Sequence, residues 1–316
     1  MGRGADAVVT LAFLFPGQGS QAVGMGRSFY DASPAAKAVF DEANDALGFD
    51  LAKLAFNGPE SDLALTANTQ PAVLTASVAA AQVAQERGLT ASLAAGHSLG
   101  EYSALVIAGA LRFADAVRVV RKRGEFMQHA VPVGTGAMAA IMGLELPAVE
   151  ALCAEAAHGE VLDVANINSA AQIVVAGHRT AVERAVALAG KKSVLLPVSA
   201  PFHCALMAPA AERLARELDG VTANDPRFPV VRNVDAGVTR TAADVKPFLL
   251  KQVASPVRWM DCVQRLVAEG ATAFVEVGPG RVLTGLLRRI VEGARGQSVE
   301  DVSGLEKALA ALQASA

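Results

Sequence analysis

The sequence is poor in aromatic residues, which make up only 5% of its 316 residues, although 52% of the residues are hydrophobic. Alanine and valine dominate the apolar half, and such small side chains suit helices packed closely on a buried sheet. The length predicts one large domain, or a large domain with a smaller companion. The composition therefore indicates a globular α/β protein and excludes a disordered one.

Cysteine is also scarce, and no charge predominates. The three cysteines, Cys153, Cys204 and Cys262, are widely spaced. An odd number at such spacing predicts neither a disulfide framework nor a zinc site, so we expect three reduced thiols. The formal net charge is −3 and the lysines and arginines are scattered, which argues against nucleic acid as a partner.

Long apolar runs are missing as well. No run approaches the length of about 20 residues that crosses a bilayer, and the start of the chain lacks the apolar core of a secretory signal. We therefore expect a cytoplasmic protein with no membrane partner.

The first third of the chain alternates short apolar runs with longer alanine-rich stretches. Pro71 suits the first turn of one such stretch and Gly88 follows its end, as is typical of a helix. A repeated strand-turn-helix pattern predicts a parallel sheet covered by helices. The predicted elements are strand Leu11–Phe15, helix Gln70–Arg87, strand Leu93–Ala95 and helix Ser98–Ala108.

A different order follows in the middle of the chain. Strand, helix, strand, strand, helix and strand in succession are typical of a small ferredoxin-like unit. We therefore predict such a subdomain at 131–199, inserted into a larger body formed by 1–130 and 200–316, with a ligand cleft between them. The predicted strands are Ala137–Gly143, Leu162–Ile167, Ile173–Gly177 and Ser193–Val198, and the helices are Leu146–Ala157 and Thr180–Leu188.

Residues Gly96–Gly100 match the Gly-x-Ser-x-Gly pattern of a nucleophile elbow. In that turn a serine hydroxyl, here that of Ser98, is exposed between a strand and a helix N-terminus, where free N–H groups favour a developing oxyanion. The alternative is a glycine-rich turn with an N-capping serine.

A nucleophilic serine needs a base, and His203 is the best placed of the five histidines. It follows the last predicted strand of the insertion, on a loop that returns to the cleft. We expect His97 to point away from the hydroxyl of its neighbour. The others are predicted near helix ends or in turns, where solvated histidines are common: His129, His158 and His178.

No acidic residue is a persuasive third member of the site. Asp163 lies at a predicted strand start and Asp235 follows the histidine in the chain. A backbone or amide carbonyl can orient the imidazole instead, because the third group mainly fixes the tautomer and the ring.

Arg123 interrupts an apolar helix face. In a helix over Leu111–Ala130 it shares one stripe with Ala116, Val120 and Met127. An inward-facing arginine needs an anion, since an unpaired buried charge is costly. Either an acidic residue of this chain forms a structural ion pair with it, or its planar fork binds a substrate carboxylate.

Six segments together resemble the malonyl-CoA:acyl carrier protein transacylases of fatty-acid synthesis, and the resemblance covers nearly the whole chain. All six occur in the family's order. They are Phe15–Gln21, Gly96–Ser103, Arg123–Met127, Asn166–Ser169, Pro201–Cys204 and Glu276–Gly280.

The resemblance implies a hydrolase-like body with a ferredoxin-like insertion, and a role for each matching residue. Ser98 would be the nucleophile, His203 the base and Arg123 the ligand of the malonyl carboxylate. The main-chain carbonyl of Gln252 would orient the histidine. The N–H groups of Gln18 and Leu99 would form the oxyanion hole, and the remaining substrate-binding residues would be Met127, Asn166, Asn168 and Phe202.

The implied reaction transfers malonyl from malonyl-CoA to an acyl carrier protein by a ping-pong mechanism, with no metal or other cofactor and with a monomeric enzyme. In related polyketide acyltransferases, a Phe directly before the histidine is typical of enzymes that prefer malonyl substrates. Phe202 occupies that position here. The rivals are an acyltransferase that serves a polyketide synthase, a thioesterase using the same elbow, and a carrier-binding module that has lost activity. Four cations could dock the carrier but suit ordinary solvated surface better: Lys191, Lys192, Arg288 and Arg289.

Overall fold

A computed structural model describes residues 9–198 and 200–314. Its larger body contains a six-stranded sheet in the order β10-β9-β1-β2-β7-β8, in which every neighbouring pair is parallel except β7 and β8. The predicted parallel sheet is thereby confirmed. The strands are β1 (Leu11–Phe15), β2 (Leu93–Gly96), β7 (Val230–Val231), β8 (Val238–Thr239), β9 (Ala273–Val277) and β10 (Gly296–Val299).

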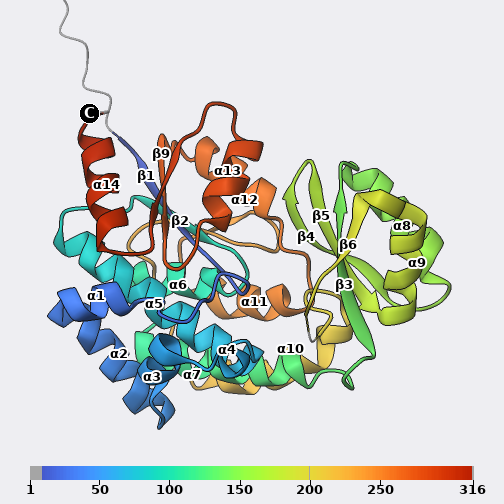
Figure 1. Cartoon of the computed structure of the whole chain (residues 1–316), viewed down its shortest axis with the longest axis horizontal. Helices are drawn as coiled ribbons and strands as arrows, with labels where there is room; N and C mark the ends of the chain where they lie inside the picture. Colours follow the sequence, from blue (N-terminus) through green and yellow to red (C-terminus); the bar gives the residue numbers. More distant parts are fainter. Residues whose placement is uncertain (1–8, 199, 315–316) are drawn as a thin grey trace, which may run out of the picture.

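Helices cover both faces of this sheet (Figure 1). The segments before the small subdomain form α1 (Arg27–Ala32), α2 (Pro34–Leu47), α3 (Leu51–Asn57), α4 (Glu60–Leu63), α5 (Thr66–Glu86), α6 (Gly100–Ile107) and α7 (Phe113–Gln128). Those after it form α10 (Ala208–Asp219), α11 (Ala242–Val253), α12 (Trp259–Ala268), α13 (Val282–Ile290) and α14 (Val302–Gln313), with a short 3₁₀ turn at Ala205–Met207.

The alternation of side chains along β1 explains the two-sided cover. All five residues of the strand are buried. Phe13 and Phe15 pack into the core beneath α5, α6 and α7, whereas Ala12 and Leu14 pack with Trp259 on the opposite face. Because successive strand residues point to opposite faces, an uninterrupted apolar run needs two cores.

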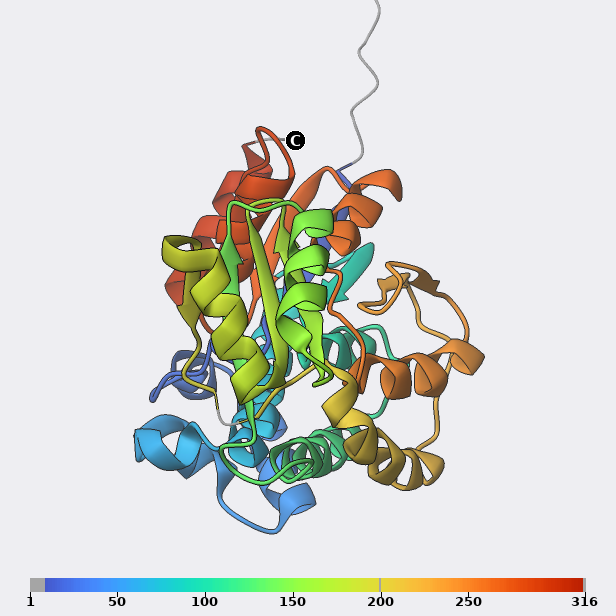
Figure 2. The same cartoon turned by 90° about the vertical axis from the view of Figure 1, so that its right-hand side faces the viewer.

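The small sheet has the order β4-β5-β3-β6 and is antiparallel throughout. This order confirms the predicted ferredoxin-like arrangement. Figure 1 shows it beside the larger body, and in Figure 2 its two helices lie in front of its strands. Its elements are β3 (Gly136–Met142), α8 (Leu146–Ala157), β4 (Leu162–Ser169), β5 (Gln172–His178), α9 (Arg179–Ala189), a 3₁₀ turn (Gly190–Lys192) and β6 (Ser193–Leu195).

Strand β3 joins the small sheet to the larger core. Ala139 and Ile141 pack against α8 and α9, whereas Met138 and Ala140 belong to the core of the larger body. A backbone bridge in which Ile167 N–H donates to the carbonyl of Val257 ties β4 to the segment before α12. The boundaries 131 and 199 themselves remain a prediction.

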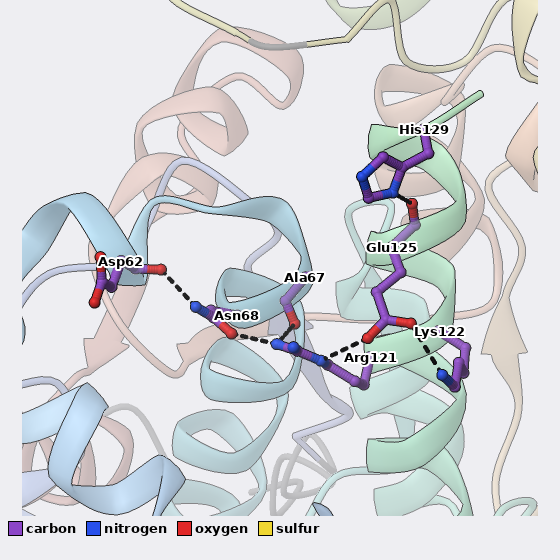
Figure 3. A network of polar contacts seen from close by, with 7 residues as sticks. All are labelled: Asp62, Ala67, Asn68, Arg121, Lys122, Glu125 and His129. Atoms are coloured by element: carbon purple, nitrogen blue, oxygen red, sulfur yellow. Dashed lines mark hydrogen bonds and ion pairs between the residues drawn. The ribbon is translucent and has the colours of Figure 1, made fainter. Parts of the chain in front are cut away.

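The prediction that Pro71 lies in the first turn of its helix was wrong. The helix α5 begins at Thr66, so Pro71 lies inside it. Proline cannot donate to the carbonyl four residues earlier, which is that of Ala67. The Arg121 guanidinium of α7 donates to this carbonyl instead, at 3.0 Å (Figure 3). A tertiary contact therefore accommodates a proline that local rules place at a helix start.

Two predicted elements beside the cleft are shorter than expected. The helix predicted from Ser98 begins only at Gly100, and the strand predicted to reach Val198 ends at Leu195. Both differences concern the cleft, because Ser98 and the segment 196–198 line its cavity. No helix in the two described ranges is long and apolar enough to span a membrane.

Candidate active site

Ser98 lies in a sharp turn between β2 and α6, with a positive φ of 51°. Such a conformation is uncommon for a residue other than glycine and is typical of strained functional sites. A Cβ on Gly96 would lie 1.9 Å from the carbonyl carbon of Gly100, and one on Gly100 would lie 2.1 Å from the carbonyl oxygen of Phe15. Both glycines are therefore required for the turn, as the elbow pattern predicts.

The hydroxyl of Ser98 and the imidazole of His203 are within hydrogen-bonding distance. Ser98 Oγ lies 2.7 Å from His203 Nε2, and His203 Nδ1 lies 2.9 Å from the main-chain oxygen of Gln252. With a carbonyl acceptor at Nδ1, that nitrogen carries the proton and Nε2 is free to accept one. The carbonyl thus occupies the place that an acid has in a triad.

The environment of His203 keeps its ring neutral. The residue is 4% exposed. Burial, followed by the positive charge of Arg123, lowers the pKa of His203 to about 3. A neutral imidazole beside a serine hydroxyl can act as a general base.

Arg123 projects into the same place from α7. Its side chain is 1% exposed, as are those of Ala116 and Met127 on the predicted apolar stripe, and Val120 is fully buried. One guanidinium nitrogen, Nη2, donates to Ser98 Oγ at 3.1 Å. The prediction that Arg123 faces inward is therefore confirmed. Figure 3 shows its neighbours Arg121 and Lys122 on α7, both paired with Glu125.

The charge of Arg123 has neutral partners only. Its Nη1 donates to Gln70 Oε1 and its Nη2 to Gln252 Oε1, both at 2.9 Å. Within residues 9–198 and 200–314 no carboxylate lies at ion-pair distance, and the Nε group lacks a hydrogen-bond partner. Burial lowers the pKa of this guanidinium. A buried cation next to a hydroxyl and without a carboxylate in direct contact is well suited to receive one.

A cavity of about 550 Å³ opens onto Ser98, His203 and Arg123. It is lined by loops and helices of the larger body and, from the small subdomain, by Met138 of β3, Asn166 of β4 and the segment 196–198 after β6. Of the residues predicted for the site, it is lined by Gln18, Ser98, Leu99, Arg123, Met127, Asn166, Phe202 and His203.

Two predicted residues do not line this cavity. Gln252 lies behind Ser98, where its amide also donates to the carbonyl oxygen of Ser98 at 3.0 Å. Asn168 contacts His97 instead, with 2.9 Å between its Oδ1 and His97 Nε2. His97 also lines the cavity and packs on the ring of Trp259, with 5.5 Å between the ring centroids. Its contact with Asn168 agrees with the prediction that it serves hydrogen bonding and packing.

The N–H groups of Gln18 and Leu99 are available for an oxyanion. Both residues line the cavity, and within the described part of the chain neither main-chain N–H makes a hydrogen bond. Leu99 directly follows the serine and precedes α6, so its N–H belongs to the helix N-terminus.

Three buried residues of the site were not predicted. Gln70 binds Arg123, as described above. Asn233 supports the elbow, because its Oδ1 accepts from Ser98 N at 2.7 Å and its Nδ2 donates to Gly96 O at 2.8 Å. Glu101 is 2% exposed, and burial raises its pKa to about 7 although Asn233 and Gln252 donate to it. Of these three, only Glu101 could have been noticed in the sequence. It is a charged residue that directly follows the elbow pattern Gly96–Gly100, at the start of a helix.

The comparisons with known proteins agree with this geometry. The acyl transferase domain family matches residues 12–314. The malonyl CoA-acyl carrier protein transacylase of Escherichia coli K12 is 50% identical over 303 residues, which cover 94% of this chain and 98% of that protein. The enzyme of the same name from Bacillus subtilis strain 168 is 47% identical over 308 residues, covering 96% and 97%.

Solved structures match over the same length. An acyl carrier protein S-malonyltransferase from Vibrio cholerae superposes with a TM-score of 0.92 at 48% identity, covering 95% of this chain and 99% of that one. A malonyl-transacylase in complex with its type II polyketide synthase acyl carrier protein gives 0.92 at 46% identity, with coverage of 95% and 99%. The chain therefore belongs to the acyl transferase family, among the malonyl-CoA:acyl carrier protein transacylases.

Proposed function

We propose that this protein transfers a malonyl group from malonyl-CoA to the phosphopantetheine thiol of an acyl carrier protein, through an ester on Ser98. The observation that carries this proposal is the position of Arg123, whose guanidinium lies 3.1 Å from Ser98 Oγ and has no carboxylate partner among the described residues. In a malonyl ester a single methylene separates the carbonyl from the free carboxylate. A carboxylate on that arm reaches the guanidinium beside the serine.

The first half-reaction forms the ester and releases coenzyme A. His203 Nε2 takes the proton of Ser98 as its oxygen attacks the thioester carbonyl. The oxyanion is held by the N–H groups of Gln18 and Leu99, each worth about 3 to 4 kcal/mol in the transition state. As the C–S bond breaks, the imidazolium returns its proton to the leaving sulfur.

The second half-reaction repeats these steps with the carrier's thiol. His203 takes the thiol proton, the sulfur attacks the ester carbonyl, and the Ser98 oxygen leaves and regains a proton. After each half-reaction the imidazole of His203 is neutral again. Neither half-reaction needs a metal or a redox cofactor. The two acyl transfers share one site, so we expect ping-pong kinetics.

Phe202, Met127 and Asn166 complete the proposed acyl pocket. Phe202 is 8% exposed and lines the cavity directly before the base. A bulky ring here crowds a branched acyl chain, so we expect malonyl to be preferred over methylmalonyl. Asn168 acts on the site through His97.

The proposed partner is an acyl carrier protein of fatty-acid synthesis, and the proposed state is a monomer in the cytoplasm. Relatives at up to 50% identity carry the transacylase name, and one solved relative is bound to a carrier protein of polyketide synthesis. The carrier of a polyketide synthase is therefore the alternative acceptor.

One competition assay tests this proposal. Malonyl-, methylmalonyl- and acetyl-CoA are offered together with a holo acyl carrier protein, and the acylated carrier is identified by intact mass. Malonyl-carrier should be the main product. Release of free malonate faster than carrier acylation would instead show a thioesterase, and no ester on Ser98 would show a module without activity.

A further inference from the structure

A cluster of three buried polar residues lies behind Ser98, away from the cavity. Glu101 comes from the first turn of α6, Asn233 from the segment between β7 and β8, and Gln252 from the last turn of α11. Glu101 is 2% exposed, and the other two are fully buried. None of them lines the cavity, so they act on the reaction only through other residues.

Glu101 is the acceptor at the centre of this cluster. Its Oε2 accepts from the main-chain N–H of Asn233 at 3.0 Å and from the side-chain amide of Gln252 at 2.7 Å. The first bond leads to the elbow, because the Asn233 side chain binds the backbone at Gly96 and Ser98. The second leads to the guanidinium, because the same Gln252 amide accepts from Arg123.

The contacts of the Gln252 amide permit only one orientation. Its Nε2 faces the Glu101 carboxyl and the carbonyl oxygen of Ser98, which both accept. Its Oε1 faces Arg123, which only donates. A flipped amide would place oxygen against oxygen at one end and N–H against N–H at the other.

Arg123 depends on this orientation. Its guanidinium is held by two neutral amide oxygens, those of Gln70 and Gln252. Without the acceptor at Glu101, the Gln252 amide keeps only the Ser98 carbonyl oxygen and the more distant Asn233 Oδ1 as acceptors. The amide is then held less firmly, which weakens one of the two contacts to Arg123. The affected contact is that of Nη2, the guanidinium nitrogen that also donates to Ser98 Oγ.

We propose that Glu101 is a positioning residue for malonyl selection, which acts through the Gln252 side chain to hold Arg123 where the malonyl carboxylate arrives. This role rests on the proposed function. It requires an acceptor oxygen at position 101, because Glu101 is bound by two N–H donors.

A merely structural role would run through Asn233 and the elbow, and it would affect every acyl donor alike. The selective role runs through Gln252 and Arg123, and it affects only donors that carry a carboxylate. Three variants separate the two routes. Asn233→Ala removes the elbow contacts of the Asn233 side chain. Gln252→Met removes the amide, with its contacts to Arg123 and to the Ser98 carbonyl oxygen, but keeps the main-chain oxygen that binds His203. Glu101→Ala removes the shared acceptor.

The experiment measures single-turnover acylation of Ser98 by malonyl-CoA and by acetyl-CoA, with intact mass as the readout. Glu101→Ala and Gln252→Met should each lower the malonyl-to-acetyl rate ratio by about 10- to 100-fold, since misplacing a binding group by about 1 Å can cost about 10²-fold. Asn233→Ala should slow both donors and leave the ratio within about 3-fold of the wild type. Glu101→Gln, which keeps an acceptor oxygen, should restore the ratio to within about 3-fold.

Several results would overturn the assignment. An unchanged ratio in Glu101→Ala, or a Glu101→Gln protein as impaired as Glu101→Ala, would show that Glu101 does not act as an acceptor for Gln252. If Glu101→Ala does not fold, an unchanged ratio in Gln252→Met has the same meaning. A wild-type protein that forms no malonyl ester would instead refute the proposed function itself.

Discussion

The parallel-sheet body and the small antiparallel sheet bury very different side chains. Within the described part of 136–195, only Asn166 and Ser169 are buried polar residues, both in β4. The body buries a whole group of them around Ser98, including Glu101, Arg123, His203, Asn233 and Gln252. Buried polar groups are costly unless they are paired, and paired groups are held rigidly. The chemistry is therefore concentrated in the body, and the small sheet provides a wall of the cleft.

Removal of the nucleophile in the body should have the largest effect on activity. Ser98→Ala should lower malonyl transfer by about 10⁶-fold, because covalent catalysis then has no acceptor atom. Incubation with malonyl-CoA and intact mass should show an ester on the wild type and none on the variant. An ester that persists in Ser98→Ala would place the nucleophile elsewhere.

Loss of the base should have a smaller effect. His203→Ala should lower transfer by about 10² to 10⁴-fold, as is usual for a general base, while the positions of Ser98 and Arg123 are kept. Rapid-quench acylation with malonyl-CoA measures this directly. Activity within about 3-fold of the wild type would exclude His203 as the base.

The pH dependence should be weaker than that of an ordinary histidine enzyme. Because the pKa of His203 is lowered to about 3, acidification from about pH 8 to about pH 5 does not protonate it, and the base stays active. We expect kcat/KM for malonyl-CoA to vary by no more than about 3-fold over that range, since this ratio reports the free enzyme. Because burial raises the pKa of Glu101 to about 7, the same profile is measured with Glu101→Gln. A fall with an apparent pKa near 6.5 that persists in this variant would contradict the buried, neutral ring.

A substitution in the small sheet should affect stability and not chemistry. Ile141 is fully buried against α8 and α9, on the face of β3 that points away from the body. Ile141→Ala should lower the free energy of unfolding by about 2 to 5 kcal/mol and leave kcat within about 2-fold below the melting temperature. Denaturant titration and a transfer assay measure the two quantities. A large loss of kcat without a loss of stability would contradict the conclusion that the chemistry is concentrated in the body and not in the small sheet.

The features of the sequence that follow a local rule predicted most of the fold. An apolar run predicted both ends of β1 correctly. The order of strands and helices predicted the ferredoxin-like unit, and the bounds of α8 are those predicted. The glycines beside Ser98 predicted the elbow, because the requirement for a residue without a Cβ at these positions is local and steric. Arg123 was predicted to face inward because helical periodicity alone places it on an apolar stripe.

Features that depend on distant contacts were not predicted. Pro71 lies inside α5 because an arginine of α7 binds the carbonyl that the proline leaves free. Asn233 supports the elbow from 135 residues away, and no pattern of neighbours marks it. The roles of Gln18, Leu99 and Gln252 came from the family resemblance, since a main-chain N–H or carbonyl has no signature in the sequence.

The central claim is that Arg123 selects malonyl by binding its carboxylate, and one measurement tests it most directly. Acylation of Ser98 by malonyl-CoA and acetyl-CoA is compared between the wild type and Arg123→Ala. The rate with malonyl-CoA should fall by up to about 10⁴-fold, as expected for a site built around a polar group, while the rate with acetyl-CoA changes far less. Equal losses with both donors would contradict the account.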